Sequence, residues 1–223
     1  MKGLIKKDLL NLSSYKTSLL ITIIFCSIAI AGTENASIAP MIICAIIGMI
    51  SLSTFNYDEV SKSEKYILSL PVNRKELVIS KYIIAISSAI IGAIIGALLT
   101  IIIVNIMNSV RPNNLIDLDY DNLFITSLSG LFGIALIQAI QIPSIYKWGA
   151  EKGRIQMFIL IFLMVLIIVG IGFTLTKLGI NLDIQKINNF LETFGAYILT
   201  LLIIIMYTIS YKVSYKIFIK KDY

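Results

Sequence analysis

Long apolar stretches alternate with short polar segments along the whole of this 223-residue chain. Runs of predominantly apolar residues of this kind are typical of helices that cross a hydrocarbon core of about 30 Å. The polar segments between them are too short to hold a soluble domain. The pattern therefore predicts a single all-α transmembrane domain over residues 1–223, with six spans at residues 17–31, 38–55, 77–107, 123–146, 155–175 and 193–213.

The first sixteen residues predict a short amphipathic helix before span one. Apolar residues recur there at spacings of one, four and three positions, and three lysines lie on the opposite side: Leu4, Ile5, Leu9 and Leu12 against Lys2, Lys6 and Lys7. A helix of this kind rests on the membrane surface with its apolar face in the lipid. The alternative is a basic flank that only orients span one.

The segment between spans two and three, residues 56–78, predicts a helix, a sharp turn and a second helix. Asp58 and Lys62 lie four positions apart, which favours a helix, and Pro71 interrupts it. Asn73 followed by Glu76 is typical of a capping box that opens the next helix.

Span three is longer than a bilayer requires, so we expect it to tilt or to extend beyond the membrane. Its Gly92-x-x-x-Gly96 motif allows another helix to approach closely, either within the chain or across a dimer. Span four contains Gln138, Gln141 and Pro143 in its inner half. Amides at such depth are costly unless they are paired, so these residues either line a pathway or bond to neighbouring helices.

The composition supports a membrane protein and excludes several kinds of chemistry. Hydrophobic residues make up 57% of the chain, charged residues only 14%, and the mean hydropathy is +0.89. There is no histidine, which excludes histidine-based acid–base catalysis. Cys26 and Cys44 lie in apolar runs and are interpreted as small buried residues. The acidic run Asp117, Asp119 and Asp121 lacks the remaining ligands of a calcium loop and is interpreted as a solvated loop, so no metal site is expected.

The basic residues indicate how the spans are oriented. Sixteen of the 19 Lys and Arg residues lie in the first, third, fifth and seventh polar segments, with Lys81 and Lys212 counted at the inner ends of their spans. Basic loops resist translocation, so these four segments are predicted to be cytoplasmic, together with both termini. No Asp, Glu, Lys or Arg lies deep within a predicted span, which argues against an ion-coupled carrier. No P-loop motif is present, so a separate chain would have to supply ATP-driven force.

Three parts of the sequence resemble the membrane subunits of ABC-2 type exporters, the permeases that pair with a separate ATPase. They are the start M-K-x-L-I-x-K-D-L, the segments FNYDE (55–59), EKYILSLPVNRKE (64–76) and SKY (80–82), and the segments IP (142–143), YKWG (146–149) and EKGR (151–154). Trp148 departs from the smaller aromatic expected in this family. Within the family, the chain looks most like the small permeases of phenol-soluble modulin exporters, which move amphipathic peptide toxins.

The resemblance implies a bacterial cell-membrane protein that is not itself an enzyme. Two permeases, as a homodimer or a paralogous heterodimer, would pair with two ATPase subunits, which would bind ATP and Mg²⁺; the permease itself would hold no cofactor. Residues 1–16 would be an elbow helix, residues 57–70 would contain the coupling helix that docks on the ATPase, and residues 147–154 would be a second contact. The substrate would be hydrophobic or amphipathic, such as a modulin or an antimicrobial peptide. Export of antimicrobial peptides would make the cell resistant to them.

The expected ATPase interface combines charged residues with an aromatic and aliphatic patch, as protein interfaces often do. It comprises Tyr57, Asp58, Glu59, Lys62, Glu64, Lys65, Tyr66, Leu70, Arg74, Lys147, Glu151, Lys152 and Arg154. The alternative is a solvated loop whose apolar end dips into lipid. Two other functions stay open from the sequence: a membrane scaffold or immunity protein that binds a peptide without moving it, and a channel.

Overall fold

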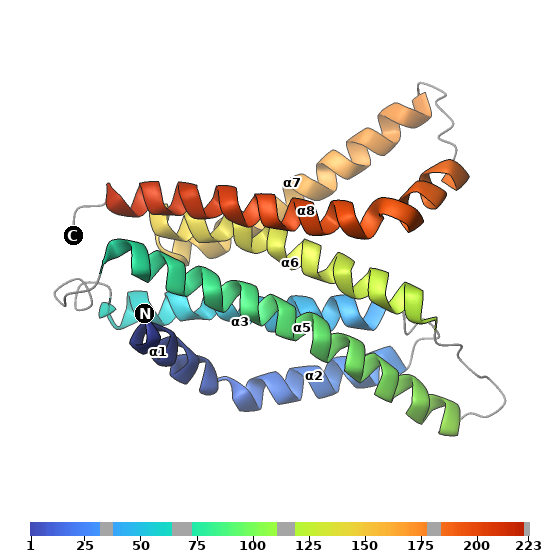
Figure 1. The fold of residues 1–223 in the computed structure, drawn as a ribbon, viewed down its shortest axis with the longest axis horizontal. Helices are drawn as coiled ribbons and strands as arrows, with labels where there is room; N and C mark the ends of the chain where they lie inside the picture. The colour runs from blue at the N-terminus through green and yellow to red at the C-terminus, as the bar shows by residue number, and fades with distance from the viewer. Residues whose placement is uncertain (32–37, 64–72, 111–118, 178–183, 221–223) are drawn as a thin grey trace.

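The computed structural model describes residues 1–31, 38–63, 73–110, 119–177 and 184–220 (Figure 1). Within these residues the long regular elements are all α-helices, and there is no strand. Their bounds are α1 Lys2–Ser13, α2 Lys16–Ala31, α3 Ala39–Val60, α5 Arg74–Val110, α6 Tyr120–Trp148, α7 Ala150–Lys177 and α8 Ile184–Ile219.

Four helices form the body of the molecule. α3 packs against α5 and α6, and α6 also packs against α8. The shorter α1 and α2 lie against α3 and α5. α7 begins beside the end of α6 and then diverges from α8 along its length (Figure 1).

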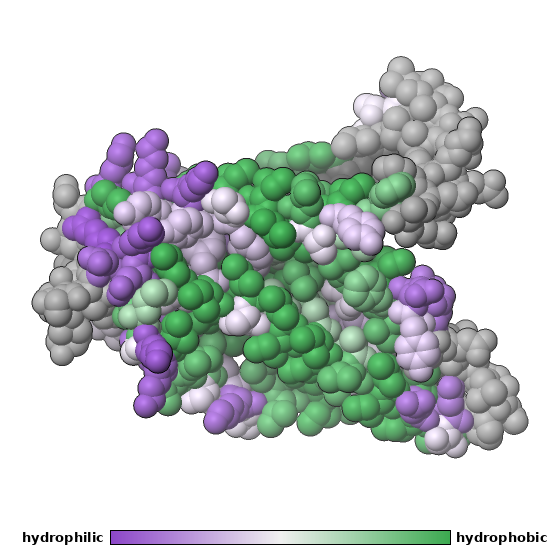
Figure 2. Space-filling view, in the orientation of Figure 1, coloured by the Kyte–Doolittle hydropathy of each residue, from purple (hydrophilic) through white to green (hydrophobic). Residues whose placement is uncertain are grey.

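The polar segments predicted to share one side of the membrane gather at one end of the bundle. α1, the last turn of α3, the first turn of α5, the junction of α6 and α7, and the last turn of α8 all lie there (Figure 1). We call this the basic end. Hydrophilic side chains cluster over it, whereas the body of the bundle is covered by apolar side chains (Figure 2).

The apolar exterior suits a lipid environment, because exposed Ile, Leu and Phe side chains would be unfavourable in water. Four of the helices in the described residues are long and apolar enough to cross a membrane: Ala39–Val60, Arg74–Val110, Tyr120–Trp148 and Phe194–Ile219. α2, with 16 residues, is about 24 Å long and would need its flanking residues to complete a crossing. The six-span topology and the cytoplasmic location of the termini stay predictions.

The helices run beyond the apolar stretches that predicted them. α5 has 37 residues and is therefore about 55 Å long, and it crosses the bundle obliquely (Figure 1). α3 continues to Val60, so residues 57–60 of the expected coupling helix belong to the end of α3. Lys62 has φ 50°, in the left-handed region, which interrupts the predicted Asp58–Lys62 helical turn. Residues 64–70 lie outside the described residues.

Small residues bring α3 close to both of its neighbours. A Cβ atom on Gly96 would lie 2.8 Å from the backbone oxygen of Pro40, and one on Gly92 would lie 3.1 Å from that of Cys44. On the other side, a Cβ atom on Gly130 would lie 2.8 Å from the Cα atom of Met41. The Gly92-x-x-x-Gly96 motif is thus buried in the chain's own α3–α5 contact rather than exposed to a second copy.

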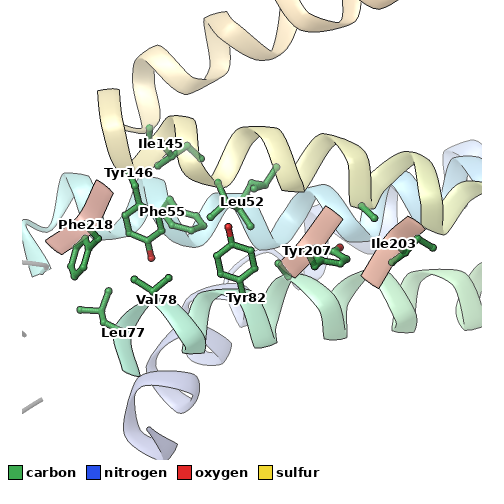
Figure 3. Close-up of a cluster of buried hydrophobic side chains, with 14 residues drawn as sticks. Leu52, Phe55, Leu77, Val78, Tyr82, Ile145, Tyr146, Ile203, Tyr207 and Phe218 are labelled. Carbon is green, nitrogen blue, oxygen red and sulfur yellow. The ribbon is translucent and has the colours of Figure 1, made fainter. Parts of the chain in front are cut away.

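An aromatic cluster fills the bundle near the basic end (Figure 3). The ring of Tyr146 lies edge-on to that of Phe55, with centroids 5.5 Å apart, and also contacts Phe218, with centroids 5.3 Å apart. These three residues come from α6, α3 and α8, so the cluster joins the ends of three helices.

Candidate functional site

Four charged side chains meet inside the basic end. Asp58, in the last turn of α3, accepts from Lys7 of α1 at 2.5 Å and from Lys81 of α5 at 2.5 Å. Lys81 also donates to Asp8 of α1 at 3.0 Å. Asp8, Asp58 and Lys81 are each at most 4% exposed, and two lysines balance two aspartates. We call these four residues the charge cluster.

Lys81 is the centre of the charge cluster. Besides the two carboxylates, its Nζ lies 3.5 Å from the backbone oxygen of Thr54 and 5.0 Å from the centroid of the Phe55 ring. A buried ammonium needs such partners, because removing it from water costs several kcal/mol. Lys81 therefore lies among polar groups supplied by α1 and α3, about two turns into α5.

The two aspartates are not equivalent. Asp58 also accepts from Ser63 Oγ at 2.7 Å, whereas the partners of Asp8 among the described residues are Lys81 at 3.0 Å and Lys7 at 3.5 Å. Burial raises the pKa of Asp8 above its ordinary value, and the attraction of Lys81 opposes this only in part. Of the two aspartates, Asp8 is thus the one that more readily takes up a proton.

The sequence did not indicate this cluster. Lys81 lies in the SKY segment and Asp8 in the first motif, but neither was assigned a role, because the three elements involved are far apart in the chain. Asp58 is expected in the ATPase interface from the sequence. In the structure its carboxylate is buried and engaged by α1 and α5, and the interface role stays a prediction.

Glu59, the residue after Asp58, connects the segment between spans two and three to the segment between spans four and five. We call these the first and the second inner segment. Its carboxylate accepts from the backbone N–H of Ala150, the first residue of α7. The positive end of the helix dipole favours a carboxylate at this position. Gly149, with φ 91°, makes the turn between α6 and α7, and a Cβ atom there would lie 3.0 Å from Glu59 Oε1. The two inner segments therefore form one surface.

This surface has a groove of about 370 Å³ between the end of α3 and the start of α7, lined by Asn56, Glu59, Val60 and Glu151. Val60 is 85% exposed at its rim. Lys62, Lys147, Glu151 and Lys152 are also exposed, and the Lys147 ammonium lies 4.4 Å from the centroid of the Trp148 ring. The groove and its rim offer both apolar and charged contacts.

The remaining residues of the expected interface differ in their placement. Tyr57 is partly buried and its ring lies edge-on to that of Tyr15, with centroids 5.6 Å apart. Arg74 is exposed and donates to the backbone oxygen of Ile219, the last residue of α8, at 2.9 Å. Outside the described residues, or with side chains that are not described, are Glu64, Lys65, Tyr66, Leu70 and Arg154.

Gln138 joins three helices. Its Nε2 donates to the backbone oxygen of Gly48 at 2.9 Å and to Ser51 Oγ at 3.2 Å, both on α3. Its Oε1 accepts from the hydroxyl of Tyr207 on α8 at 2.5 Å. The side chain is fully buried and bonds to neighbouring helices, which is one of the two roles that the sequence leaves open for it.

Pro143 and Gln141 lie one turn nearer the basic end. Pro143 has no N–H, which leaves the carbonyl of Ala139 without its usual helical donor. Ser210 Oγ of α8 donates to this carbonyl at 2.7 Å, and Tyr82 of α5 bonds to Ser210 at 2.6 Å. Gln141 is 5% exposed, and its Oε1 has no hydrogen-bond partner among the described residues.

The described residues contain no group of three or more His, Cys, Asp or Glu side chains that could hold a metal ion. Asp119, from the acidic run, caps α6 by accepting from the backbone N–H of Asp121 at 3.0 Å. Asp117 lies outside the described residues. Cys44 is a buried free thiol whose sulfur lies 3.6 Å from the backbone oxygen of Ala89.

Comparison with known proteins identifies the family. Residues 3–219 match the family described as ABC-2 family transporter protein, which is almost the whole chain. The chain therefore belongs to the ABC-2 transporter family and is a multi-pass membrane protein. Permeases of this family normally work with an ATPase subunit. No curated protein and no solved structure matches the chain.

Proposed function

We propose that this chain is the permease subunit of an ATP-driven exporter and that a separate ATPase docks on its basic end. The family match over residues 3–219 carries this proposal. The contact between Glu59 and Ala150 supports it, because a single docking event would engage both inner segments at once. ATP and Mg²⁺ would be bound by the ATPase subunit.

The docking surface is proposed to centre on the groove between α3 and α7. Val60 supplies an exposed apolar contact at its rim, and Lys62, Glu151 and Lys152 surround it with charges of both signs. An apolar centre with a charged rim is the usual composition of a specific protein interface. Closure of the ATPases on ATP would then push on the ends of α3 and α7.

Two exposed valines at helix ends allow a matched test. Val60 ends α3 at the basic end, and Val110 ends α5 at the opposite end, with 85% and 72% of their surfaces exposed. We expect Val60→Asp to reduce co-purification of the ATPase by about tenfold, since a buried unpaired carboxylate weakens an interface. Val110→Asp should leave it unchanged. Equal ATPase recovery with both variants would contradict the proposed docking surface.

We further propose that the substrate is hydrophobic or amphipathic, with peptides such as phenol-soluble modulins as the class suggested by the resemblance. An almost wholly apolar groove of about 380 Å³ between α5 and α6 supports this, with Ile94, Leu98, Phe124 and Leu128 among its lining residues. The test is ATP-dependent uptake of a fluorescent amphipathic helical peptide into inside-out vesicles. Peptide binding without ATP-dependent accumulation would instead favour a scaffold or immunity protein.

A further inference from the structure

We infer that Asp58 is a positioning residue that makes the first inner segment and α1 move as one unit. This inference rests on the proposed function, because the movement would originate at the ATPase. It adds α1, the predicted elbow helix, to the part of the molecule that responds directly to the ATPase. The charge cluster supplies the connection.

Asp58 is where three separate parts of the chain converge. It accepts from Lys7 on α1 and from Lys81 on α5, and also from Ser63, three residues beyond the end of α3. Glu59 follows it directly and holds the start of α7. Any displacement of the last turn of α3 therefore acts on two short charge-assisted hydrogen bonds to other helices.

Burial protects the carboxylate end of both bonds. Asp58 is 3% exposed and Lys81 is 4% exposed, whereas the side chain of Lys7, which makes the link to α1, is 32% exposed. Separating a buried pair leaves an uncompensated charge, which is strongly unfavourable. A movement that keeps α1 on α3 is consequently favoured over one that leaves α1 behind.

α1 is also held to α5, through the Asp8–Lys81 pair at 3.0 Å and through Met1, whose N-terminal ammonium lies 3.5 Å from Glu76. Leu4 packs against the buried core, but Leu9 and Leu10 on the same helix are 54% and 60% exposed. Those leucines are free to enter the lipid surface. α1 thus has one face toward the charge cluster and another available to the membrane. Through these two faces, α1 would transmit movement of the first inner segment to the bilayer surface.

The first test uses the chain alone in phosphatidylglycerol-containing nanodiscs, with hydrogen–deuterium exchange as the readout. The double variant Lys7→Met with Asp58→Asn removes the α1–α3 link but keeps the Asp8–Lys81 pair, so no net charge is left buried. We expect exchange in residues 2–13 to be about tenfold faster, with residues 92–104 unchanged. Unchanged exchange in α1, or equal acceleration throughout the bundle, would overturn the inference.

The matched control is Glu59→Gln, because Glu59 adjoins Asp58 but bonds to α7 instead of α1. It should affect exchange around residues 150–154 and leave α1 as in the wild type. Faster exchange of α1 in this variant, comparable with that of the double variant, would overturn the assignment to Asp58.

The second test adds the ATPase subunit. On binding ATP, α1 should change its exchange in the wild type but not in the Lys7→Met and Asp58→Asn double variant. An equal response of α1 in both would overturn the inference. Failure of the ATPase to bind the wild type would count against the proposed function, and the test on the chain alone would still decide this inference.

Discussion

Buried polar side chains in this protein are held by partners that come from other helices. Gln138 bonds to α3 and α8, Ser210 satisfies the carbonyl that Pro143 leaves free, and Lys81 lies between two carboxylates. Each of these groups would be costly in an apolar interior without its partners. The individual residues therefore determine how the helices fit against one another.

The stability contributed by Gln138 can be measured by removing its amide. Gln138→Leu should lower the free energy of unfolding by about 1–3 kcal/mol, because the hydroxyl of Tyr207 would lose its buried acceptor. The measurement is thermal unfolding of the purified protein in detergent. Gln141→Leu is the matched control, since its Oε1 makes no hydrogen bond to a described residue, and it should cost clearly less. Equal losses would contradict the role assigned to Gln138.

The raised pKa of Asp8 predicts a particular dependence of stability on pH. Its titration contributes stability that is fully present below the ordinary pKa of about 3.9 and is lost as the pH rises through the higher pKa of the folded protein. Relative to Asp8→Asn, the wild type should therefore lose free energy of unfolding as the pH rises through this window. Unfolding in detergent across a series of buffers would measure the difference. A wild type that gains free energy of unfolding relative to Asp8→Asn as the pH rises would contradict the raised pKa.

At the scale of helices, the close contact of α3 with α5 depends on the absence of side chains. Gly92 and Gly96 face the backbone of α3, where no flexible side chain can move aside. Close approach of this kind maximises van der Waals packing, which is the main attraction between helices in lipid. The same contact brings the end of α3 to the start of α5, where Asp58 meets Lys81.

Substitution of Gly96 tests this contact. Gly96→Leu should destabilise the protein by about 1–3 kcal/mol or more and separate α3 from α5, because its Cβ atom would lie 2.8 Å from the backbone oxygen of Pro40. Gly133→Leu, on α6, is the control, since apart from its own turn of helix nothing described lies within 4 Å of the corresponding Cβ position. Thermal unfolding in detergent would compare them. Similar effects of both substitutions would show that helix propensity, and not close packing, dominates.

At the scale of the whole molecule, segments that are far apart in sequence share the basic end. The predicted topology places that end in the cytoplasm. In a background without Cys26 and Cys44, Lys152→Cys at the basic end should be protected from a membrane-impermeant maleimide added to intact cells. Asn122→Cys, at the start of α6, should be labelled. Labelling of Lys152→Cys alone would contradict the predicted orientation. Labelling of both cysteines, or of neither, would contradict the single crossing predicted between the two positions.

Much of the helical architecture could be predicted from the pattern of apolar residues. Spans three and four correspond to α5 and α6, because a long apolar stretch in lipid must satisfy its backbone hydrogen bonds internally and so forms a helix. The ends of the helices were less predictable. α3 continues past Phe55 to Val60 because the aromatic cluster and the charge cluster hold its last turns, although those turns are polar in sequence.

The amino-acid sequence by itself determined the class of protein and its alternation of apolar and polar segments, since both are matters of composition and local periodicity. Only the tertiary structure decided which polar residues are buried together. Asp58 reads locally as one of several charges on an exposed helix, yet its environment is made by Lys7 and Lys81, from two other helices. The pairing of buried charges depends on contacts between distant segments, and no local pattern records those contacts.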